Sequence, residues 1–280
     1  MKDAYQKLVS NIIAWGEICS RLYAAVIIGS HARSDHQADE YSDLDIIMIV
    51  DEPDYFLSSD QWLNDIGEYH ISFVENTIGG EKERRVLFEL SLDVDFIILP
   101  QSSIKALTSE EGATILGNGF CVIIDKIGLQ DIITPPSQTK QTAILPTEQE
   151  FINIVNDFWY HCVWAVKKLQ RGELWTAKFC IDYYMKCKLL SIIEHHALAM
   201  HGLDYNTWHD GRFIEEWAEK WIIEKLSRCF AYYDKADIKA ALHATMDLFR
   251  VVAIETAEML NFKYPQAADQ YSYDRVQNGE

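Results

Sequence analysis

The sequence predicts an α+β protein in two parts, a mixed sheet with flanking helices followed by an all-α helical bundle. Two observations lead to this prediction. Short apolar runs rich in β-branched and aromatic residues recur in the first half of the chain, as is typical of buried strands. In the second half, apolar residues instead follow long helical patterns, over about 148–170, 173–201, 213–230 and 236–262.

The expected first part begins with a helix and continues with strands. Apolar residues at helical spacing over 4–22 predict a helix with one buried face. Ser and Asp residues in 58–68 can cap a further short helix. Six strand candidates are recognised by their β-branched and aromatic content, and they span 23–29, 44–50, 70–76, 84–90, 94–100 and 119–125.

A proline-rich segment separates the two parts. Three of the six prolines lie within 131–150, and because proline fixes φ and removes a backbone donor, this segment is expected to be a linker or a surface strap. We therefore expect one domain over 1–135 and a second over 136–280, with an active site between them. The tail, 269–280, is expected to be loose.

Composition narrows the possible partners. The chain has 43 acidic and 25 basic residues, a formal charge of −18, so it repels phosphate backbones and no nucleic-acid partner is expected. Most of this excess, −13, falls within 1–130. This negative charge can keep the protein soluble or attract a cationic substrate, and the charge alone does not distinguish these two roles.

Cysteine usage and hydropathy indicate the compartment. The six cysteines are scattered, with no C-x-x-C pair, which argues against a zinc site or a disulfide framework and favours reduced thiols. No apolar run approaches the roughly 20 residues that a membrane span needs. A cytoplasmic protein without a membrane partner is therefore expected.

Residues 29–45, GSHARSDHQADEYSDLD, carry the first candidate site. A strand candidate ends at Gly29, where glycine allows a sharp turn and close approach of a ligand, and Ser30 adds a hydroxyl and an N–H suited to a phosphate oxygen. Asp43 and Asp45 open the next strand two residues apart, so their side chains share a face. Such carboxylates repel each other unless a divalent cation lies between them, and oxygen ligands suit Mg²⁺, which also takes phosphates.

Asp95 offers a third carboxylate near the start of the strand candidate 94–100. An acid there is costly unless it has a partner. If this strand lies beside 44–50, Asp95 would reach the same metal. Nucleotidyl transfer needs neutralised phosphate charge and a group that accepts the proton of the attacking hydroxyl, and three carboxylates meet both needs. Asp93 and Glu89 remain alternatives to Asp95 as the base.

The order Gly-Ser, about a dozen residues, Asp-x-Asp and a distant third Asp resembles the nucleotidyltransferases related to DNA polymerase beta. Further segments, "SSDQWLN", "DVDFIILP", "FW" with "AVKKL" after it, and "FRVV" with "LNFKYP", resemble the aminoglycoside 6-adenylyltransferases, or streptomycin adenylyltransferases, from about residue 5 to 265. The resemblance implies a polymerase-beta-like nucleotidyltransferase domain. It also implies transfer of AMP from ATP to a hydroxyl of a streptomycin-like aminoglycoside, which confers antibiotic resistance.

The resemblance implies a role for each matching residue of the first domain. Asp43 and Asp45 match the family's metal-binding aspartates, which are expected to hold two Mg²⁺ ions. Asp95 matches the third acid, which contacts metal and the acceptor and acts as the general base. Gly29 and Ser30 match the loop that binds the nucleotide phosphates.

Other matches are less direct. Lys167 and Lys186 fall where the family has basic residues and are assigned to the ATP triphosphate. The family usually has Arg directly after Gly-Ser, but His31 stands there in this chain, so the phosphate contact has either moved to Arg33 or weakened. Glu68 either binds an amine of the acceptor or caps a turn.

The acceptor is less defined than the reaction, because 195–217 differs in character from the streptomycin enzymes. The expected partners are ATP and a small cationic, hydroxylated acceptor, bound by a monomer or homodimer. One alternative is the same transfer to a lincosamide, another small metabolite or a protein side chain. The other is a catalytically silent nucleotide-binding module, which would lack one of the three acids.

Overall fold

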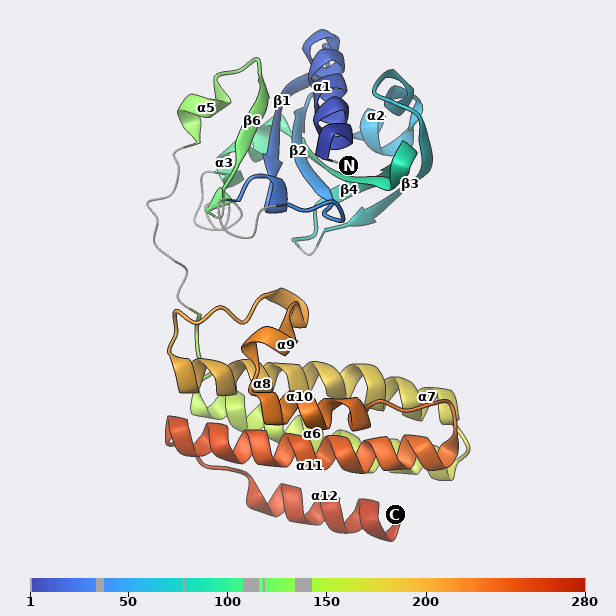
Figure 1. The fold of residues 1–280 in the computed structure, drawn as a ribbon, viewed down its shortest axis with the longest axis vertical. Coiled ribbons are helices and arrows are strands. Elements are labelled where there is room, and N and C mark those ends of the chain that lie inside the picture. The colour runs from blue at the N-terminus through green and yellow to red at the C-terminus, as the bar shows by residue number, and fades with distance from the viewer. Residues whose placement is uncertain are drawn as a thin grey trace. The chain divides into compact units, whose positions relative to one another are not determined.

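The computed structural model describes residues 2–33, 38–77, 79–107, 116–117, 119–133 and 143–279. The chain divides into two compact units, Met1–Thr139 and Lys140–Glu280, here called the N-terminal unit and the helical unit (Figure 1). Each is considered by itself. The expected domain boundary between 135 and 136 lies outside the described residues.

The N-terminal unit is built on a six-stranded mixed sheet in the order β3-β4-β5-β2-β1-β6. Its strands are β1 (Leu22–Ile28), β2 (Leu44–Val50), β3 (Tyr69–Asn76), β4 (Lys82–Phe88), β5 (Leu92–Pro100) and β6 (Cys121–Asp125). β2 and β5 are parallel, and the other neighbouring strands are antiparallel. Each strand overlaps one of the six segments expected from the sequence, which confirms the mixed sheet.

One face of this sheet packs against α1 (Lys2–Ile18) and α2 (Pro53–Ser58), with a 3₁₀ turn over Gln61–Asp65 (Figure 1). The expected helix over 58–68 is thus only the end of α2 and this turn. Trp15 of α1 stacks on Trp62 with ring centroids 5.1 Å apart. The second face is covered by α3 (Ile104–Leu107) and α5 (Leu129–Ile132), which pack over β1 and β2.

The helical unit has one continuous apolar core. Its helices are α6 (Glu148–Gln170), α7 (Leu174–Phe179), α8 (Met185–His201), α9 (Ile214–Trp217), α10 (Lys220–Leu226), α11 (Lys235–Leu260) and α12 (Gln266–Asn278). α6 begins with a capping box between Thr147 and Glu150. The pattern over 173–201 is divided into α7, a π-helical turn and α8. None of the helices in the described parts of the chain is long and apolar enough to cross a membrane.

The expectation of a loose tail over 269–280 is wrong, because most of this segment lies in α12. Asp269 is fully buried, and its carboxylate accepts hydrogen bonds from Nε of Arg250 and from the hydroxyl of Tyr264, both at 2.8 Å. Val276 is also buried. Part of what holds this helix is polar, and a search for apolar periodicity does not detect such contacts.

Candidate active site

Three aspartates meet on the sheet of the N-terminal unit. Asp43 directly precedes β2, Asp45 is the second residue of β2, and Asp95 lies in β5. Because the two strands are parallel and Asp45 stands opposite Asp95, both side chains leave the same face at the same level. One carboxylate oxygen from each aspartate lies within 4.8 Å of the other two. The structure thus brings together the three acids expected to form the metal site.

This donor set fits a divalent cation. All three ligands are carboxylate oxygens, which hard cations such as Mg²⁺ prefer. Three carboxylates this close repel one another, so a cation between them would relieve an unfavourable arrangement. Asp93 and Glu89, the alternative bases, lie outside this group among the described residues.

Arg85 is the residue of this site that the sequence did not reveal. It stands opposite Asp95 on β4 and donates a hydrogen bond from Nε to Oδ1 of Asp95 at 2.8 Å. The same guanidinium lies 3.3 Å from Oε1 of Glu75 and 3.8 Å from Oδ2 of Asp93. Burial raises the pKa of Asp95 to about 7, although Arg85 opposes the shift. A carboxylate with such a pKa can accept a proton at neutral pH.

The Gly-Ser turn lies against the aspartates. β1 ends at Ile28, opposite Asp45, and the chain turns at Gly29 with φ of 68°. A Cβ atom at this position would collide with Oδ2 of Asp45, so glycine is required both by the backbone and by the carboxylate. The hydroxyl of Ser30 donates to the carbonyl of Asp43 at 3.4 Å.

Two unsatisfied nitrogen atoms follow the turn. His31 packs on the ring of Tyr5 with centroids 5.0 Å apart, and burial lowers the pKa of its imidazole. Nε2 of His31 and Nε of Arg33 are buried without a hydrogen-bond partner among the described residues. With Ser30 they line a cavity of about 600 Å³. A phosphate oxygen there could accept a hydrogen bond from Nε of Arg33, so the assignment of Arg33 to the nucleotide stays a prediction with a physical basis.

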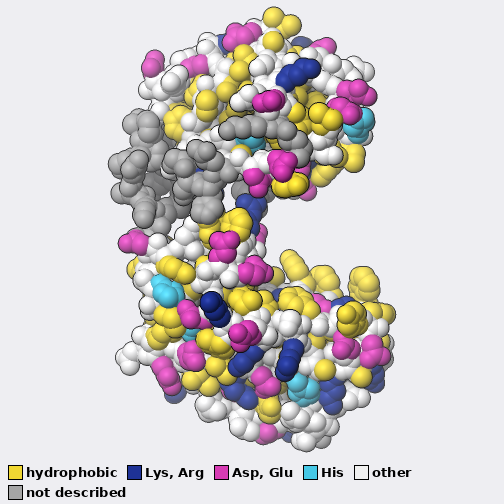
Figure 2. Space-filling view, in the orientation of Figure 1, with side chains coloured by type: hydrophobic (Ala, Val, Ile, Leu, Met, Phe, Trp, Pro, Cys, Tyr) yellow, Lys and Arg dark blue, Asp and Glu magenta, His cyan; other side chains and the backbone are white. Residues whose placement is uncertain are grey.

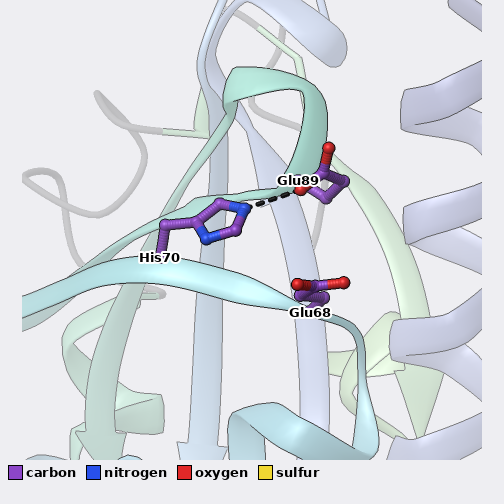
Figure 3. Close-up of side chains that lie close together, drawn as sticks. All are labelled: Glu68, His70 and Glu89. Carbon is purple, nitrogen blue, oxygen red and sulfur yellow. Dashed lines mark hydrogen bonds and ion pairs between the residues drawn. The ribbon is translucent and has the colours of Figure 1, made fainter.

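Glu68 lies outside the aspartate cluster. It precedes β3 and belongs to a group with His70 and Glu89, in which one ligand atom from each residue lies within 4.8 Å of the others (Figure 3). Nε2 of His70 and Oε2 of Glu89 are 2.6 Å apart, and this contact lowers the pKa of Glu89. All three side chains are exposed. The role of Glu68 in binding an amine stays a prediction.

The two predicted phosphate ligands of the helical unit differ in their surroundings. Lys167 is exposed on α6 and lines a cavity of about 310 Å³. Nζ of Lys186 donates to the carbonyl of Ile181 and to the hydroxyl of Thr245, each at 2.9 Å, and burial lowers its pKa to about 8. Since an ammonium has three donors, only one remains on Lys186 for a ligand.

The mixed sheet carries an Asp-x-Asp pair beside a Gly-Ser turn and a third Asp on the parallel neighbouring strand, which is the arrangement that the resemblance to nucleotidyltransferases implies. The family model described as Streptomycin adenylyltransferase matches residues 1–276, and the chain belongs to this family. This match confirms the resemblance inferred from the sequence, together with the enzyme class.

Individual relatives can be aligned with most of this chain. An aminoglycoside 6-adenylyltransferase of Campylobacter jejuni is 24% identical over 262 residues, which cover 91% of this chain and 88% of the relative. One of Bacillus subtilis (strain 168) is 21% identical over 252 residues, covering 88% and 87%. A crystal structure of an aminoglycoside 6-adenyltransferase from Bacillus subtilis aligns over 98% of this chain and 96% of that chain, with 19% identity and a TM-score of 0.45.

Proposed function

We propose that this enzyme transfers AMP from Mg-ATP to a hydroxyl of a streptomycin-like aminoglycoside and so confers resistance. The observation that carries the proposal is the cluster of Asp43, Asp45 and Asp95, whose oxygens lie within 4.8 Å of one another. The family and the names of its relatives support the nature of the acceptor. All three acids are present, which disfavours the catalytically silent alternative.

In the proposed reaction, the acceptor oxygen attacks the α-phosphorus of ATP. A P–O bond to the acceptor forms, the bond from the α-phosphorus to the bridging oxygen breaks, and pyrophosphate leaves. The hydroxyl proton passes to Asp95, because a carboxylate beside the attacking oxygen can act as the general base. Arg85 holds Oδ1 of Asp95 through a 2.8 Å hydrogen bond, which fixes the orientation of this carboxylate.

Asp43 and Asp45 would hold the magnesium, with Asp95 as a further ligand. When bound, Mg²⁺ supplies neutralisation of phosphate charge. Gly29 keeps the backbone clear of the Asp45 carboxylate, and Ser30 and Arg33 would donate to phosphate oxygens. We propose Lys167 and Lys186 of the helical unit for the same triphosphate.

Charge supports a cationic acceptor. Residues 1–130 carry 22 acidic and 9 basic side chains, and in Figure 2 acidic side chains are spread over the visible face of the N-terminal unit, drawn above. Such a surface raises the local concentration of a polycation and its association rate. Carboxylates are also the natural partners of ammonium and guanidinium groups.

The test is pyrophosphate release from Mg-ATP by the full-length protein, with and without streptomycin. We expect release that depends on streptomycin and falls by about 10²–10⁴-fold in Asp95→Asn. Asp65→Asn, the same change at an exposed position, is the matched control and should retain activity.

Two results would contradict the proposal. Release that continues in Asp95→Asn would exclude this residue as the base. If Mg-ATP binds but streptomycin stimulates no release, streptomycin is not the acceptor. A panel with lincosamides and other hydroxylated metabolites would then identify the acceptor.

A further inference from the structure

The sheet face that carries Asp95 continues across β4 and β3. Phe73 stands opposite Arg85, and Arg85 stands opposite Asp95, so these three side chains form one row on the same face. Two parallel rows flank it. We call these positions the open face, with the rows Ile71–Leu87–Asp93, Phe73–Arg85–Asp95 and Glu75–Glu83–Ile97.

The open face is exposed where the rest of the sheet is covered. Phe73 and Ile71 are 48% and 55% exposed, although both are large apolar side chains in a strand. On the same face, the strands beyond β5 are buried beneath α3 and α5. On the opposite face, β4 contributes Val86 and Phe88 to the main core. Neighbouring exposed apolar side chains of this kind mark a binding surface.

The open face also has more negative than positive groups. Four carboxylates, those of Glu75, Glu83, Asp93 and Asp95, surround a single cation, Arg85. Arg85 contacts three of them, and Glu83 forms no ion pair within the described residues. Burial raises the pKa of Glu83, with a further rise from Glu75, although Arg85 opposes the shift. An apolar surface bordered by unbalanced carboxylates suits a ligand that has ring faces and positive charges.

We propose that the open face binds the acceptor, a polycationic amino sugar, with a ring against Phe73 and Ile71 and cationic groups at Glu83 and Glu75. This inference rests on the proposed function and adds to it where the acceptor lies and what selects it. The alternative occupants are the chain's own helical unit and a second copy of the chain.

The strand geometry sets the spacing of the recognised groups. Diagonal neighbours on adjacent strands are about 7–8 Å apart, so a cation at Glu83 lies roughly one sugar ring from the hydroxyl at Asp95. Glu75 stands opposite Glu83 on β3, one strand further from Asp95, and neighbouring strands are about 4.8 Å apart. The acceptor is therefore expected to carry one cation near the reacting hydroxyl and a second on the side of the neighbouring strand.

The first experiment measures how charge removal affects the acceptor. Glu83→Gln is expected to raise the KM for streptomycin about tenfold, since it removes a charge-assisted contact of about 1.4 kcal/mol. The KM for ATP and kcat should stay within twofold. Binding of streptomycin alone, measured by calorimetry, should weaken by the same factor. Glu17→Gln, an equal charge change on exposed α1, is the control.

The outcomes separate the two proposals. If wild-type enzyme adenylylates streptomycin and Glu83→Gln behaves as Glu17→Gln does, the open face does not bind the acceptor while the proposed function stands. If wild-type enzyme neither binds nor uses streptomycin, both proposals are overturned. Phe73→Ala should raise the KM for streptomycin as Glu83→Gln does, and Phe73→Tyr should restore it.

The second experiment tests the other occupants. Hydroxyl-radical footprinting of the full-length protein should modify Phe73 readily without ligand and much less with saturating streptomycin. Protection of Phe73 without ligand would mean that the helical unit or a second copy covers the open face, and would overturn the proposal. Sedimentation of the same sample distinguishes these two occupants.

Discussion

Arg85 determines how the carboxylate of Asp95 is presented. Its neighbour Arg84 points to the opposite side of β4, where it is buried and donates from Nε to the carbonyl of Phe56 at 2.9 Å. Arg85 instead donates to Asp95 at 2.8 Å. Adjacent arginines in one strand thus serve different purposes, because successive side chains point to opposite faces.

Arg85→Met should lower kcat/KM for the acceptor by about 10–100-fold, the usual effect of losing a partner that orients a metal-ligating side chain. Arg85→Lys should restore part of the activity. Because Arg85→Met leaves the buried carboxylate of Asp95 without its cation, the thermal midpoint should fall in Arg85→Met and recover in part in Arg85→Lys. Arg21→Met, at a surface pair with Glu52, is the control. Activity of Arg85→Met within twofold of wild type would exclude an orienting role.

Comparing Gly29→Ala with Gly128→Ala distinguishes the cost of backbone strain from the effect of a Cβ atom on the Asp45 carboxylate. Alanine at φ of 68° costs about 1–2 kcal/mol, and its Cβ would displace the Asp45 carboxylate. Gly128→Ala has a similar φ, 71°, with no atom near the added Cβ. Both variants should lose similar stability, and only Gly29→Ala should lose Mg²⁺-dependent activity, by 100-fold or more. Equal activity in the two variants would exclude crowding of Asp45.

Sequence spacing was sufficient to find the three aspartates, because Asp43 and Asp45 lie two residues apart where one strand begins and Asp95 lies near the start of another apolar run. Arg85 could not be found in this way. Its partner is fixed by the register between β4 and β5, and register depends on turns and on packing of the whole sheet. Glu83 and Phe73 escape sequence analysis for the same reason.

At the scale of elements, α8 carries two neighbouring groups with opposite pKa shifts. Burial and Asp210 raise the pKa of Glu194 to about 7, and burial lowers that of His195 to about 4 despite Glu150. The native state therefore holds the Glu194 proton more tightly than the unfolded chain, and the His195 proton less tightly. The two residues give stability opposite dependences on pH.

Glu194→Gln and His195→Gln should thus change stability in different pH ranges. In the wild type, ionisation of Glu194 lowers the free energy of unfolding as the pH rises from 4.5 to 7. Glu194→Gln lacks this loss, so its stability relative to wild type should be higher at pH 8 than at pH 4.5. As the pH falls from 6.5 to 4, the unfolded chain binds a proton at His195 more readily than the native state does, and the free energy of unfolding decreases. His195→Gln should therefore lose less stability than wild type on acidification. Urea unfolding at pH 4.5, 6.5 and 8 measures both, and parallel curves would refute both.

α12 shows what apolar periodicity leaves out. Asp269 is 1% exposed and pairs with Arg250, so Asp269→Asn leaves the partly buried guanidinium of Arg250 without its anion and should cost about 3 kcal/mol. Asp274→Asn, at an exposed position of the same helix, should change the free energy of unfolding little. An equal effect of both substitutions would mean that the buried pair does not stabilise α12. α6, with a strong apolar face and a capping box, was predicted with the bounds that it has.

At the scale of the whole molecule, the −18 charge should affect association with the acceptor. We expect kcat/KM for streptomycin to fall several-fold between 50 and 300 mM salt, because the attraction is screened over a shorter Debye length. kcat at saturating acceptor should change little, and an acceptor with fewer charges should show a shallower slope. A flat dependence for streptomycin would mean that the acidic surface serves solubility only.

Successive side chains in β3 and β4 point to opposite faces of the sheet, so residues that maintain the fold and residues of the open face alternate along the strand. The even-numbered residues Arg84, Val86 and Phe88 of β4 are buried and maintain the fold, while odd-numbered residues of β3 and β4 such as Phe73 and Glu83 point to the open face. Apart from Arg85, which holds Asp95, odd positions of these strands can therefore be substituted without disturbing the core or the aspartates. The acceptor range of such an enzyme can drift in evolution, or be redirected by a library limited to those positions, while the adenylylation chemistry is inherited unchanged.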